Sequence, residues 1–184
     1  YRPDLVIGTG GYVCGPIVFC ASTMGISTMI HEQNAFPGIT NKFLAHFADQ
    51  IMVNFQASEQ YFVHKERICV TGLPVRQEIL STNREEGLSY FGFSPNNVTL
   101  LISGGSRGAR SLNQAMVDAY PALMEHPTLQ ILHLTGATDY ENTINSLKKR
   151  GIFLEAHPQI QIKPYLDEMQ YALAAADFCV GRAG

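Results

Sequence analysis

Residues 98–120 read VTLLISGGSRGARSLNQAMVDAY, and this stretch decides the fold. Residues 99–103 form a short run rich in leucine and β-branched side chains, which predicts a buried strand ending at Gly104. From Ala109 onward the apolar residues return every three to four positions, at Leu112, Ala115, Met116 and Ala119. That spacing is the period of a helix, so the stretch predicts a strand, a glycine-rich turn and a helix.

The glycine-rich turn between this strand and this helix predicts a phosphate site. Gly105 and Gly108 let the backbone turn sharply and approach a ligand closely. The start of the following helix offers unpaired N–H groups and partial positive charge. Ser106 adds a hydroxyl donor, and Arg107 and Arg110 add positive charge. The alternative is a plain strand-to-helix turn of an α/β core, without a ligand.

The composition is that of a folded chain without a nucleic-acid partner. Of the 184 residues 46% are hydrophobic and 16% are charged, which leaves enough apolar material for a core. The formal net charge is −3, and Lys and Arg form no long run, which disfavours nucleic acid. The longest apolar runs are too short to span a membrane. The four cysteines form no C-x-x-C pair and are predicted to be buried free thiols.

Strands and helices alternate along the whole chain. In the first half we expect helices at 17–24 and 38–47 and strands at 4–8, 27–30, 50–54 and 68–71. In the second half we expect helices from 109, at 140–149 and at 166–176, and strands at 99–103, 129–134, 160–163 and 178–181. This spacing indicates parallel βαβ units. Residues 81–97 are polar and weakly periodic, so we predict two Rossmann-like α/β domains, 1–80 and 98–184, joined by 81–97.

Open parallel sheets bind ligands beyond the carboxyl ends of their strands. Both glycine-rich turns, the segment 31–34 and Arg76 follow such ends. We therefore expect these residues to line one cleft between the two domains.

Familiar cofactor motifs do not fit this chain. The dinucleotide fingerprint G-x-G-x-x-G matches Gly8 and Gly10 but meets Val13 at its third position. The chain contains no P-loop signature, no Asp-x-Asp pair and no metal-type histidine spacing, and isolated histidines such as His46 and His133 are predicted to be structural. We expect no cofactor and no metal, so phosphate neutralisation falls to backbone N–H groups, a helix terminus and arginine.

Five segments occur in the same order as in one bacterial enzyme family. They are GTGGYVCGP at 8–16, HEQNAFPGITN at 31–41, LPVR at 73–76, GGSRGA at 104–109 and KPYLDEM at 163–169. By these segments the chain resembles the MurG family, the UDP-N-acetylglucosamine:N-acetylmuramyl-(pentapeptide) pyrophosphoryl-undecaprenol N-acetylglucosamine transferases. The resemblance spans nearly the whole chain, and it implies a GT-B fold of two Rossmann-like domains facing a cleft, both incomplete in this chain.

The resemblance implies an inverting glycosyltransferase of peptidoglycan synthesis. GlcNAc would move from UDP-GlcNAc to the C4 hydroxyl of MurNAc in undecaprenyl-pyrophosphoryl-MurNAc-pentapeptide, converting lipid I to lipid II. The family works peripherally at the cytoplasmic face of the bacterial inner membrane. The reaction needs a general base, which we cannot name. Two alternatives stay open, a UDP-GlcNAc 2-epimerase-like enzyme and a non-catalytic nucleotide-sugar-binding subunit.

Carried over by position, the resemblance assigns four residues to UDP-GlcNAc. Asn34 would touch the sugar, Arg76 and Ser106 the nucleotide and its diphosphate, and Leu166 the uracil. Arg76 follows Pro74 at a strand end, and the forked donors of arginine suit a diphosphate. The plainer alternatives are a surface role for Arg76 and a core role for Leu166.

The resemblance places the first glycine-rich turn at the acceptor. Gly10, Gly11 and Gly15 would lie near the acceptor diphosphate. His31 and Glu32 are further candidates at a strand end, where they could equally cap neighbouring backbone groups.

Gly105 and Arg107 are further candidates in the second glycine-rich turn, where the chain departs from the family pattern. The family has Gln in place of Arg107, and it has Asn where this chain has Leu73 before Pro-Val-Arg. The chain opens directly on a strand and stops after residues 182–184, so we expect a piece of a longer protein that is inactive by itself.

Overall fold

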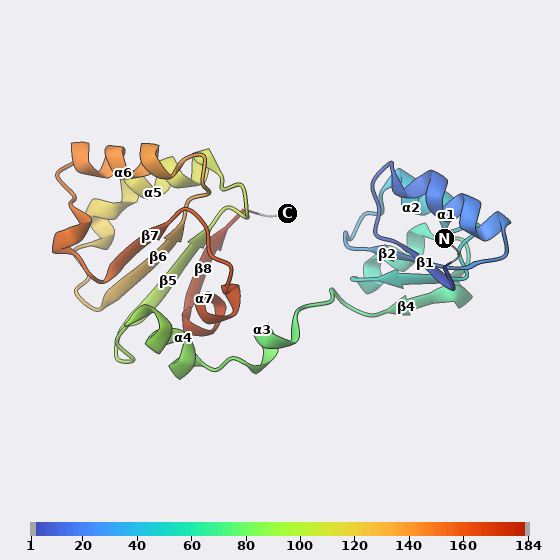
Figure 1. The fold of residues 1–184 in the computed structure, drawn as a ribbon, viewed down its shortest axis with the longest axis horizontal. Coiled ribbons are helices and arrows are strands. Elements are labelled where there is room, and N and C mark those ends of the chain that lie inside the picture. The colour runs from blue at the N-terminus through green and yellow to red at the C-terminus, as the bar shows by residue number, and fades with distance from the viewer. Residues whose placement is uncertain (1–2, 183–184) are drawn as a thin grey trace. The chain divides into compact units, whose positions relative to one another are not determined.

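A computed structural model describes residues 3–182 of the chain. The chain divides into two compact units, residues 1–75 (unit 1) and residues 76–184 (unit 2). Each unit contains one four-stranded parallel sheet (Figure 1). Within residues 3–182, no helix combines the length and the apolar character that crossing a membrane requires.

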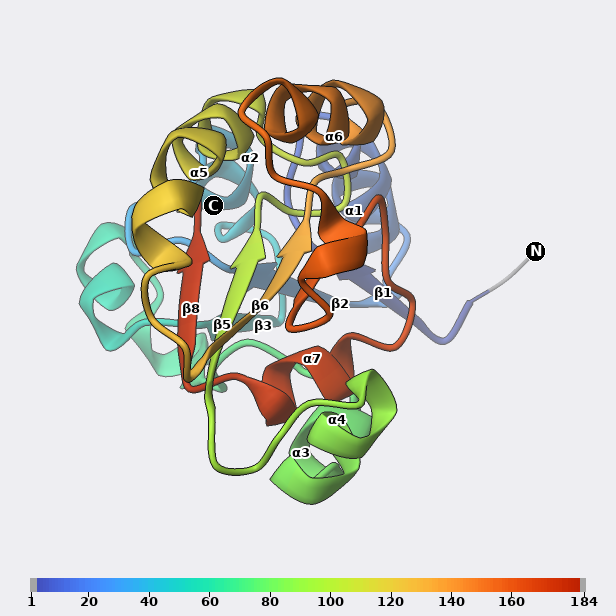
Figure 2. The same cartoon turned by 90° about the vertical axis from the view of Figure 1, so that its left-hand side faces the viewer.

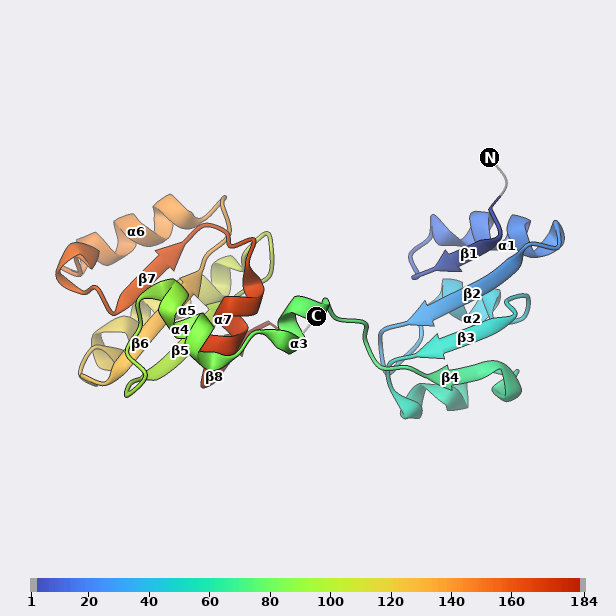
Figure 3. The same cartoon turned by 60° about the horizontal axis from the view of Figure 1, so that its bottom comes forward.

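Unit 1 is a parallel sheet whose strands pair in the order of the sequence (Figure 3). The strands are β1 (Leu5–Gly8), β2 (Ser27–Glu32), β3 (Gln50–Val53) and β4 (Ile68–Val70). The helices are α1 (Cys14–Thr23) and α2 (Ile39–Leu44), with the short 3-10 helices η1 (Gln56–Tyr61) and η2 (Lys65–Arg67).

The core of unit 1 lies between this sheet and the helices α1 and α2, which cover the same face (Figure 3). Val18 of α1 and Leu44 of α2 pack on Ile30, Ile51 and Val53 of the two central strands. Side chains alternate between the two faces of a strand, and these three point toward the face that the helices cover, so they are completely buried. Because β1, β2 and β3 are parallel, their carboxyl ends lie at the same edge of the sheet.

Unit 2 has strands β5 (Val98–Ser103), β6 (Leu129–Leu134), β7 (Ile160–Lys163) and β8 (Phe178–Gly181). They are parallel and pair in the order β7-β6-β5-β8. The helices are α3 (Gln77–Ser81), α4 (Arg84–Phe91), α5 (Arg110–Leu123), α6 (Tyr140–Lys149) and α7 (Met169–Ala175), with the 3-10 helix η3 (Leu154–Ala156).

Both faces of the unit 2 sheet are covered, so this unit has two cores. Helices α5 and α6 lie on one face, and α4 and α7 lie on the other (Figure 2). Successive residues of β5 face opposite cores, with Ile102 under Val117 of α5 and Leu101 under Ala172 of α7. A strand that is buried on both faces reads as a continuous apolar run, which is the pattern of residues 99–103.

The structure differs from the sequence prediction for the interdomain connection, residues 81–97. The units divide between Val75 and Arg76, and α4 belongs to unit 2. Helix α4 begins in a capping box, in which Asn83 and Glu86 exchange hydrogen bonds. It buries Leu88 and Phe91 against α7. This burial comes from a partner helix some 80 residues away, which local periodicity does not report.

Two smaller predictions were wrong. Helix α1 begins at Cys14, three residues earlier than predicted. The cysteines are free, but Cys20, Cys69 and Cys179 are exposed rather than buried. Cys69 and Cys179 lie on β4 and β8, which are the outer strands of their sheets.

Candidate functional site

Ser106 and Leu166, which are 60 positions apart in the sequence, line the same cavity in unit 2. The cavity has a volume of about 160 Å³, and its walls come from the turn after β5, the end of β6 and the segment that leads into α7. The lining residues are Ser103, Gly105, Ser106, Leu134, Pro164, Tyr165, Leu166 and Met169. A mostly apolar cavity with a few polar groups is typical of a site for a small organic molecule.

The turn after β5 rests directly on the backbone at the end of β6. Gly105 and Gly108 have φ angles of +87° and +73°, which residues with side chains rarely adopt. A Cβ atom on Gly108 would overlap the carbonyl of Thr135, and one on Gly136 would overlap the carbonyl of Arg107. Only glycine fits at these two contacts, so the glycines determine how closely the turn approaches β6.

The first turn of α5 is open toward this loop. Its N-cap residue Ala109 has extended backbone and no side-chain oxygen that could accept from the first N–H groups. Ser106, Arg107 and Arg110 are exposed next to it. A 14-residue helix adds partial positive charge at this end. Free N–H groups, a hydroxyl and two guanidinium groups are together suited to a phosphate.

Glu32 is the centre of a second group of candidate residues, in unit 1. Its side chain is 1% exposed and accepts four hydrogen bonds. Oε1 accepts from the backbone N and Nδ2 of Asn34, both at 2.9 Å, and Oε2 accepts from Gly38 N at 3.0 Å and Asn41 Nδ2 at 2.8 Å. Burial raises the pKa of Glu32, but these hydrogen bonds outweigh it and hold the pKa below its ordinary value. Glu32 is therefore an anion with both oxygens occupied, and it orders residues 33–38.

His31 connects the same group to the end of β4. Gln33 Nε2 lies 3.1 Å from His31 Nδ1 and 3.1 Å from the Thr9 carbonyl, so it donates to both. His31 Nδ1 accepts, which leaves the proton on Nε2, 3.1 Å from the carbonyl of Gly72. Gly72 has a φ of +70° and starts the segment that leads to Arg76. His31 thus contacts the backbone just after the end of β4.

The glycines of the first turn have two different roles. Gly10 and Gly11 have φ angles of +93° and +77° and form the turn between β1 and α1. Gly10 faces the side chain of Asn41, whose Nδ2 would lie 3.5 Å from an added Cβ. Gly15 instead lies inside α1, where an added Cβ would contact Thr40 at 3.4 Å. Gly15 therefore belongs to the packing of α1 on α2 rather than to the turn.

The remaining candidates are exposed. Arg76 is the N-cap residue of α3, and it does not line the cavity of Ser106 and Leu166. Leu73, the departure from the family pattern, is 54% exposed. Asn34 is exposed too, and its side-chain amide donates to Glu32.

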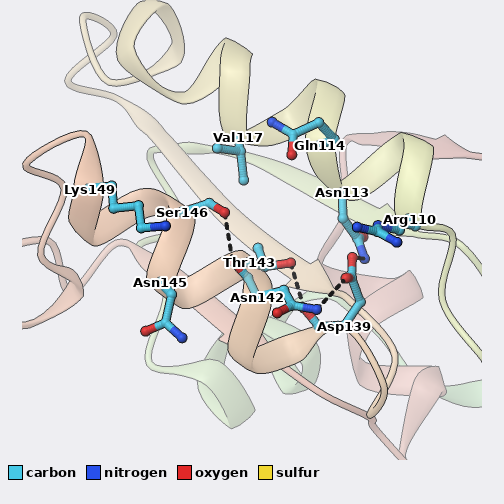
Figure 4. Close-up of a pocket in the computed structure, with 10 residues that line it drawn as sticks. All are labelled: Arg110, Asn113, Gln114, Val117, Asp139, Asn142, Thr143, Asn145, Ser146 and Lys149. Atoms are coloured by element: carbon cyan, nitrogen blue, oxygen red, sulfur yellow. Dashed lines mark hydrogen bonds between the residues drawn. The ribbon is translucent and has the colours of Figure 1, made fainter.

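Sequence reasoning missed a polar crevice between α5 and α6 (Figure 4). It has a volume of about 280 Å³, with Arg110 near one end and Lys149 at the other. Asp139 lies in this crevice, and its carboxylate accepts hydrogen bonds from the side-chain amides of Asn113 and Asn142. The buried face of α5 contains Asn113 with Met116, Val117 and Tyr120, whereas the apolar spacing recognised in the sequence did not include Asn113.

Two family models match the chain. Residues 1–53 match the N-terminal domain of glycosyltransferase family 28, and residues 99–184 match the C-terminal domain of the same family. The order of the two matches is the order of the two units.

Curated relatives match over the full chain. A UDP-N-acetylglucosamine--N-acetylmuramyl-(pentapeptide) pyrophosphoryl-undecaprenol N-acetylglucosamine transferase of Desulforamulus reducens is 54% identical over 184 residues, and the enzyme of that name from Halothermothrix orenii is 44% identical over 186. The crystal structure of Acinetobacter baumannii MurG matches 98% of this chain and 47% of its own, with a TM-score of 0.66 and 31% identity. The chain belongs to the MurG family, within glycosyltransferase family 28.

This membership confirms the predicted fold class, an α/β fold of GT-B type with Rossmann-like parallel-sheet units. The chain spans about half the length of the curated MurG-family relatives it matches. The UDP-GlcNAc 2-epimerase of Neisseria meningitidis, solved with UDP-GlcNAc, also matches, with a TM-score of 0.70 and 11% identity over 99% of this chain and 54% of its own. At that identity the likeness shows the fold alone.

Proposed function

We propose that this protein is an inverting N-acetylglucosaminyltransferase that moves GlcNAc from UDP-GlcNAc to lipid I and so makes lipid II for peptidoglycan. The observation that carries the proposal is the identity of 42% to 54% between this whole chain and curated transferases of that name. The epimerases are 11% to 15% identical, so the epimerase alternative is not favoured. A non-catalytic binding subunit is not favoured either, because the matching relatives are named as enzymes.

On the donor side, we place UDP-GlcNAc at unit 2. The uracil would occupy the cavity against Leu166, and the diphosphate would lie at Ser106 and the first N–H groups of α5. This placement is supported by the shared cavity of Ser106 and Leu166 and by the open N-terminus of α5. Gly105 and Arg107 belong to the same turn, where Arg107 adds charge close to the diphosphate.

The proposed reaction is a single displacement. The C4 hydroxyl of MurNAc attacks the anomeric carbon of GlcNAc, its proton passes to a general base, and UDP leaves as the glycosidic bond to it breaks. Negative charge grows on the diphosphate as UDP departs. Ser106, the α5 N–H groups and Arg76 stabilise this charge, and such preorganised donors commonly make the largest contribution to catalysis. None of the described residues is assigned as the base.

On the acceptor side, we assign Gly10 and Gly11 to the diphosphate of lipid I and Asn34 to the transferred sugar. The support is that the positive φ angles of both glycines expose backbone to a ligand, and that Glu32 holds Asn34 at the start of an ordered loop. Glu32 and His31 act here by positioning their neighbours. Gly15 contributes through helix packing.

We further propose that the protein works peripherally at the cytoplasmic face of the bacterial inner membrane, where its lipid-linked acceptor resides. Unit 1 supports this with apolar side chains that face solvent. Ile39 is 87% exposed and Phe43 is 51% exposed on α2, and the ammonium group of Lys42 lies 4.0 Å from the ring centre of Phe36. Exposed apolar groups next to a lysine are suited to the surface of a bilayer that contains anionic lipids.

Ser106→Ala and Arg76→Ala in the full-length protein test the nucleotide assignment. Each change removes a donor to the diphosphate, and for the arginine we expect a loss of about 1.5 to 3 kcal/mol in UDP binding, because a charge-assisted contact is lost. Titration calorimetry with UDP measures the affinity, and transfer of labelled GlcNAc to a lipid I analogue measures turnover. Ser89→Ala, an exposed serine on α4, is the matched control and should change neither quantity.

Two results would contradict the proposal. Unchanged UDP affinity and turnover in both variants would remove the nucleotide site. Conversion of UDP-GlcNAc to its C2 epimer without any acceptor, and no transfer to lipid I, would show an epimerase instead.

A further inference from the structure

A line of buried polar side chains runs through unit 2, and the proposed reaction does not use it. Tyr120 and His133 are completely buried, and Asn113 is 1% exposed. Tyr120 Oη lies 3.2 Å from His133 Nδ1, His133 Nε2 lies 3.1 Å from Asn113 Oδ1, and Asn113 Nδ2 lies 2.7 Å from Asp139 Oδ2. The line connects α5 with β6 and with the residue that precedes α6.

Only one arrangement of hydrogens satisfies this line. Asn113 Nδ2 donates to Asp139 and also, at 2.9 Å, to the carbonyl of Thr135, so Asn113 Oδ1 is the acceptor. His133 Nε2 therefore carries a proton, and His133 Nδ1 accepts from the Tyr120 hydroxyl. Burial lowers the pKa of His133 to about 4, against the opposing effect of the charge on Asp139, so the imidazole is neutral near pH 7.

The carbonyl of Thr135 joins this line to the glycine-rich turn after β5. Gly108 packs against that same carbonyl so closely that it has no room for a Cβ atom. Asn113 itself lies in the first turn of α5, directly after the glycine-rich turn, close to Arg110 and Asp139 (Figure 4). One side-chain amide thus ties the beginning of α5 to the backbone on which the turn rests.

We propose that Asn113, oriented by His133 and Asp139, is a positioning residue that holds the Gly105–Gly108 turn and the first N–H groups of α5 in the geometry that a diphosphate requires. The inference rests on the proposed function, in which this turn binds UDP-GlcNAc.

The physical reason is the direction of the bonds. Apolar packing between α5 and β6 is non-directional and allows the helix to shift along the strand. Hydrogen bonds on both sides of one amide fix the start of α5 against the end of β6. A displacement of about 1 Å at a preorganised site is enough to weaken it strongly.

His133→Gln and His133→Asn are a matched pair for the test. A glutamine amide reaches the place of Nε2 and still donates to Asn113, whereas an asparagine amide ends near Nδ1 and does not. In the full-length protein, we expect the dissociation constant of UDP to stay within about twofold in His133→Gln and to rise about tenfold in His133→Asn and in Asn113→Ala. Titration calorimetry well below each variant's melting temperature measures it.

Val117→Ala controls for a general loss of stability. Val117 is buried on α5 one turn beyond Asn113, and its truncation opens a cavity in the same core without touching the glycine-rich turn. We expect Val117→Ala to lower the melting temperature and to leave UDP affinity unchanged. If Asn113→Ala does not fold, the two His133 variants decide the matter.

Amide hydrogen exchange of the Gly105–Gly108 turn in nucleotide-free protein gives a readout that does not depend on UDP. Exchange should speed up in His133→Asn and Asn113→Ala and stay unchanged in Val117→Ala. Equal UDP affinity and equal exchange in the two His133 variants would overturn the inference. If Ser106→Ala and Arg76→Ala both leave UDP affinity and turnover unchanged, the nucleotide assignment fails instead, and exchange of the turn still decides whether Asn113 positions it.

Discussion

Replacing Glu32 with glutamine tests whether its carboxylate orders the loop of residues 33–38. Each carboxylate oxygen accepts two hydrogen bonds, from Asn34 on one side and from Gly38 and Asn41 on the other. The amide NH₂ cannot accept, so two bonds are lost whichever oxygen it replaces. A hydrogen bond to a charged group contributes about 1.5 to 3 kcal/mol. We take the lower end because the glutamine can turn its NH₂ group toward Asn34, which is exposed and can bond to water instead. The expected local destabilisation is about 3 kcal/mol.

Amide hydrogen exchange at Asn34 and Gly38 measures this effect locally, which a global melting curve of a two-unit protein does not. A loss of about 3 kcal/mol corresponds to exchange about a hundredfold faster in Glu32→Gln. Asp4→Asn, an acid-to-amide change at an exposed position of unit 1, is the control and should leave both amides unchanged.

The pH dependence provides a second check. The pKa of Glu32 is lower in the folded protein than in the unfolded chain, so its stabilisation is present above the unfolded pKa and is lost as the pH falls through the folded one. After correction for the pH dependence of the intrinsic exchange rate, the protection of the Gly38 amide from exchange should therefore decline in acid for the native protein. In Glu32→Gln it should not change with pH. Exchange within threefold of native at neutral pH would refute the role of the carboxylate as the anchor of this loop.

Two further predictions concern unit 2. The pKa of His133 is about 4 in the folded protein against an ordinary 6.5, so an unfolded chain binds the proton first, and stability should fall by up to about 3 kcal/mol between pH 6.5 and pH 4. Urea unfolding across this range should show the decline, and an equally steep decline in His133→Gln would assign it to other groups. A Cβ on Gly87 would lie 2.6 Å from the carbonyl of Tyr171 and 2.7 Å from Ala175 N, so Gly87→Ala should cost about 1 to 3 kcal/mol by forcing α4 away from α7. A fall in melting temperature no greater than that of Ser89→Ala, an exposed change on the same helix, would show that the two helices are not in close contact.

The strands and helices near the site follow from local pattern. The residue ranges predicted for β6, α6, β7 and β8 coincide with the observed ones. Their periods differ clearly, and glycine, proline or polar residues mark their ends, so each segment carries its own signal. The glycine-rich turn at 104–108 was recognisable for the same reason, because its glycines are required by positive φ angles and close backbone contact.

Helix α4 shows where local pattern stops. Residues 84–91 have a weak helical period, although the capping box of Asn83 and Glu86 was visible in the sequence. What makes them part of unit 2 is burial of Leu88 and Phe91 against α7, with Gly87 allowing the two backbones to approach. The stabilising contacts are made with residues about 80 positions further along the chain, and no local window contains them.

The sequence by itself thus determined the two α/β units, the glycine-rich turns and the family, because periodicity, turn residues and motif order are local properties. Only the tertiary structure decided what the individual polar side chains do. Glu32 accepts four hydrogen bonds because folding places four donors around its carboxylate. His133 is hydrogen-bonded to Asn113 because packing of α5 on β6 brings together two residues that are 20 positions apart. The partners of a buried polar group are chosen by packing, and packing is a property of the whole unit.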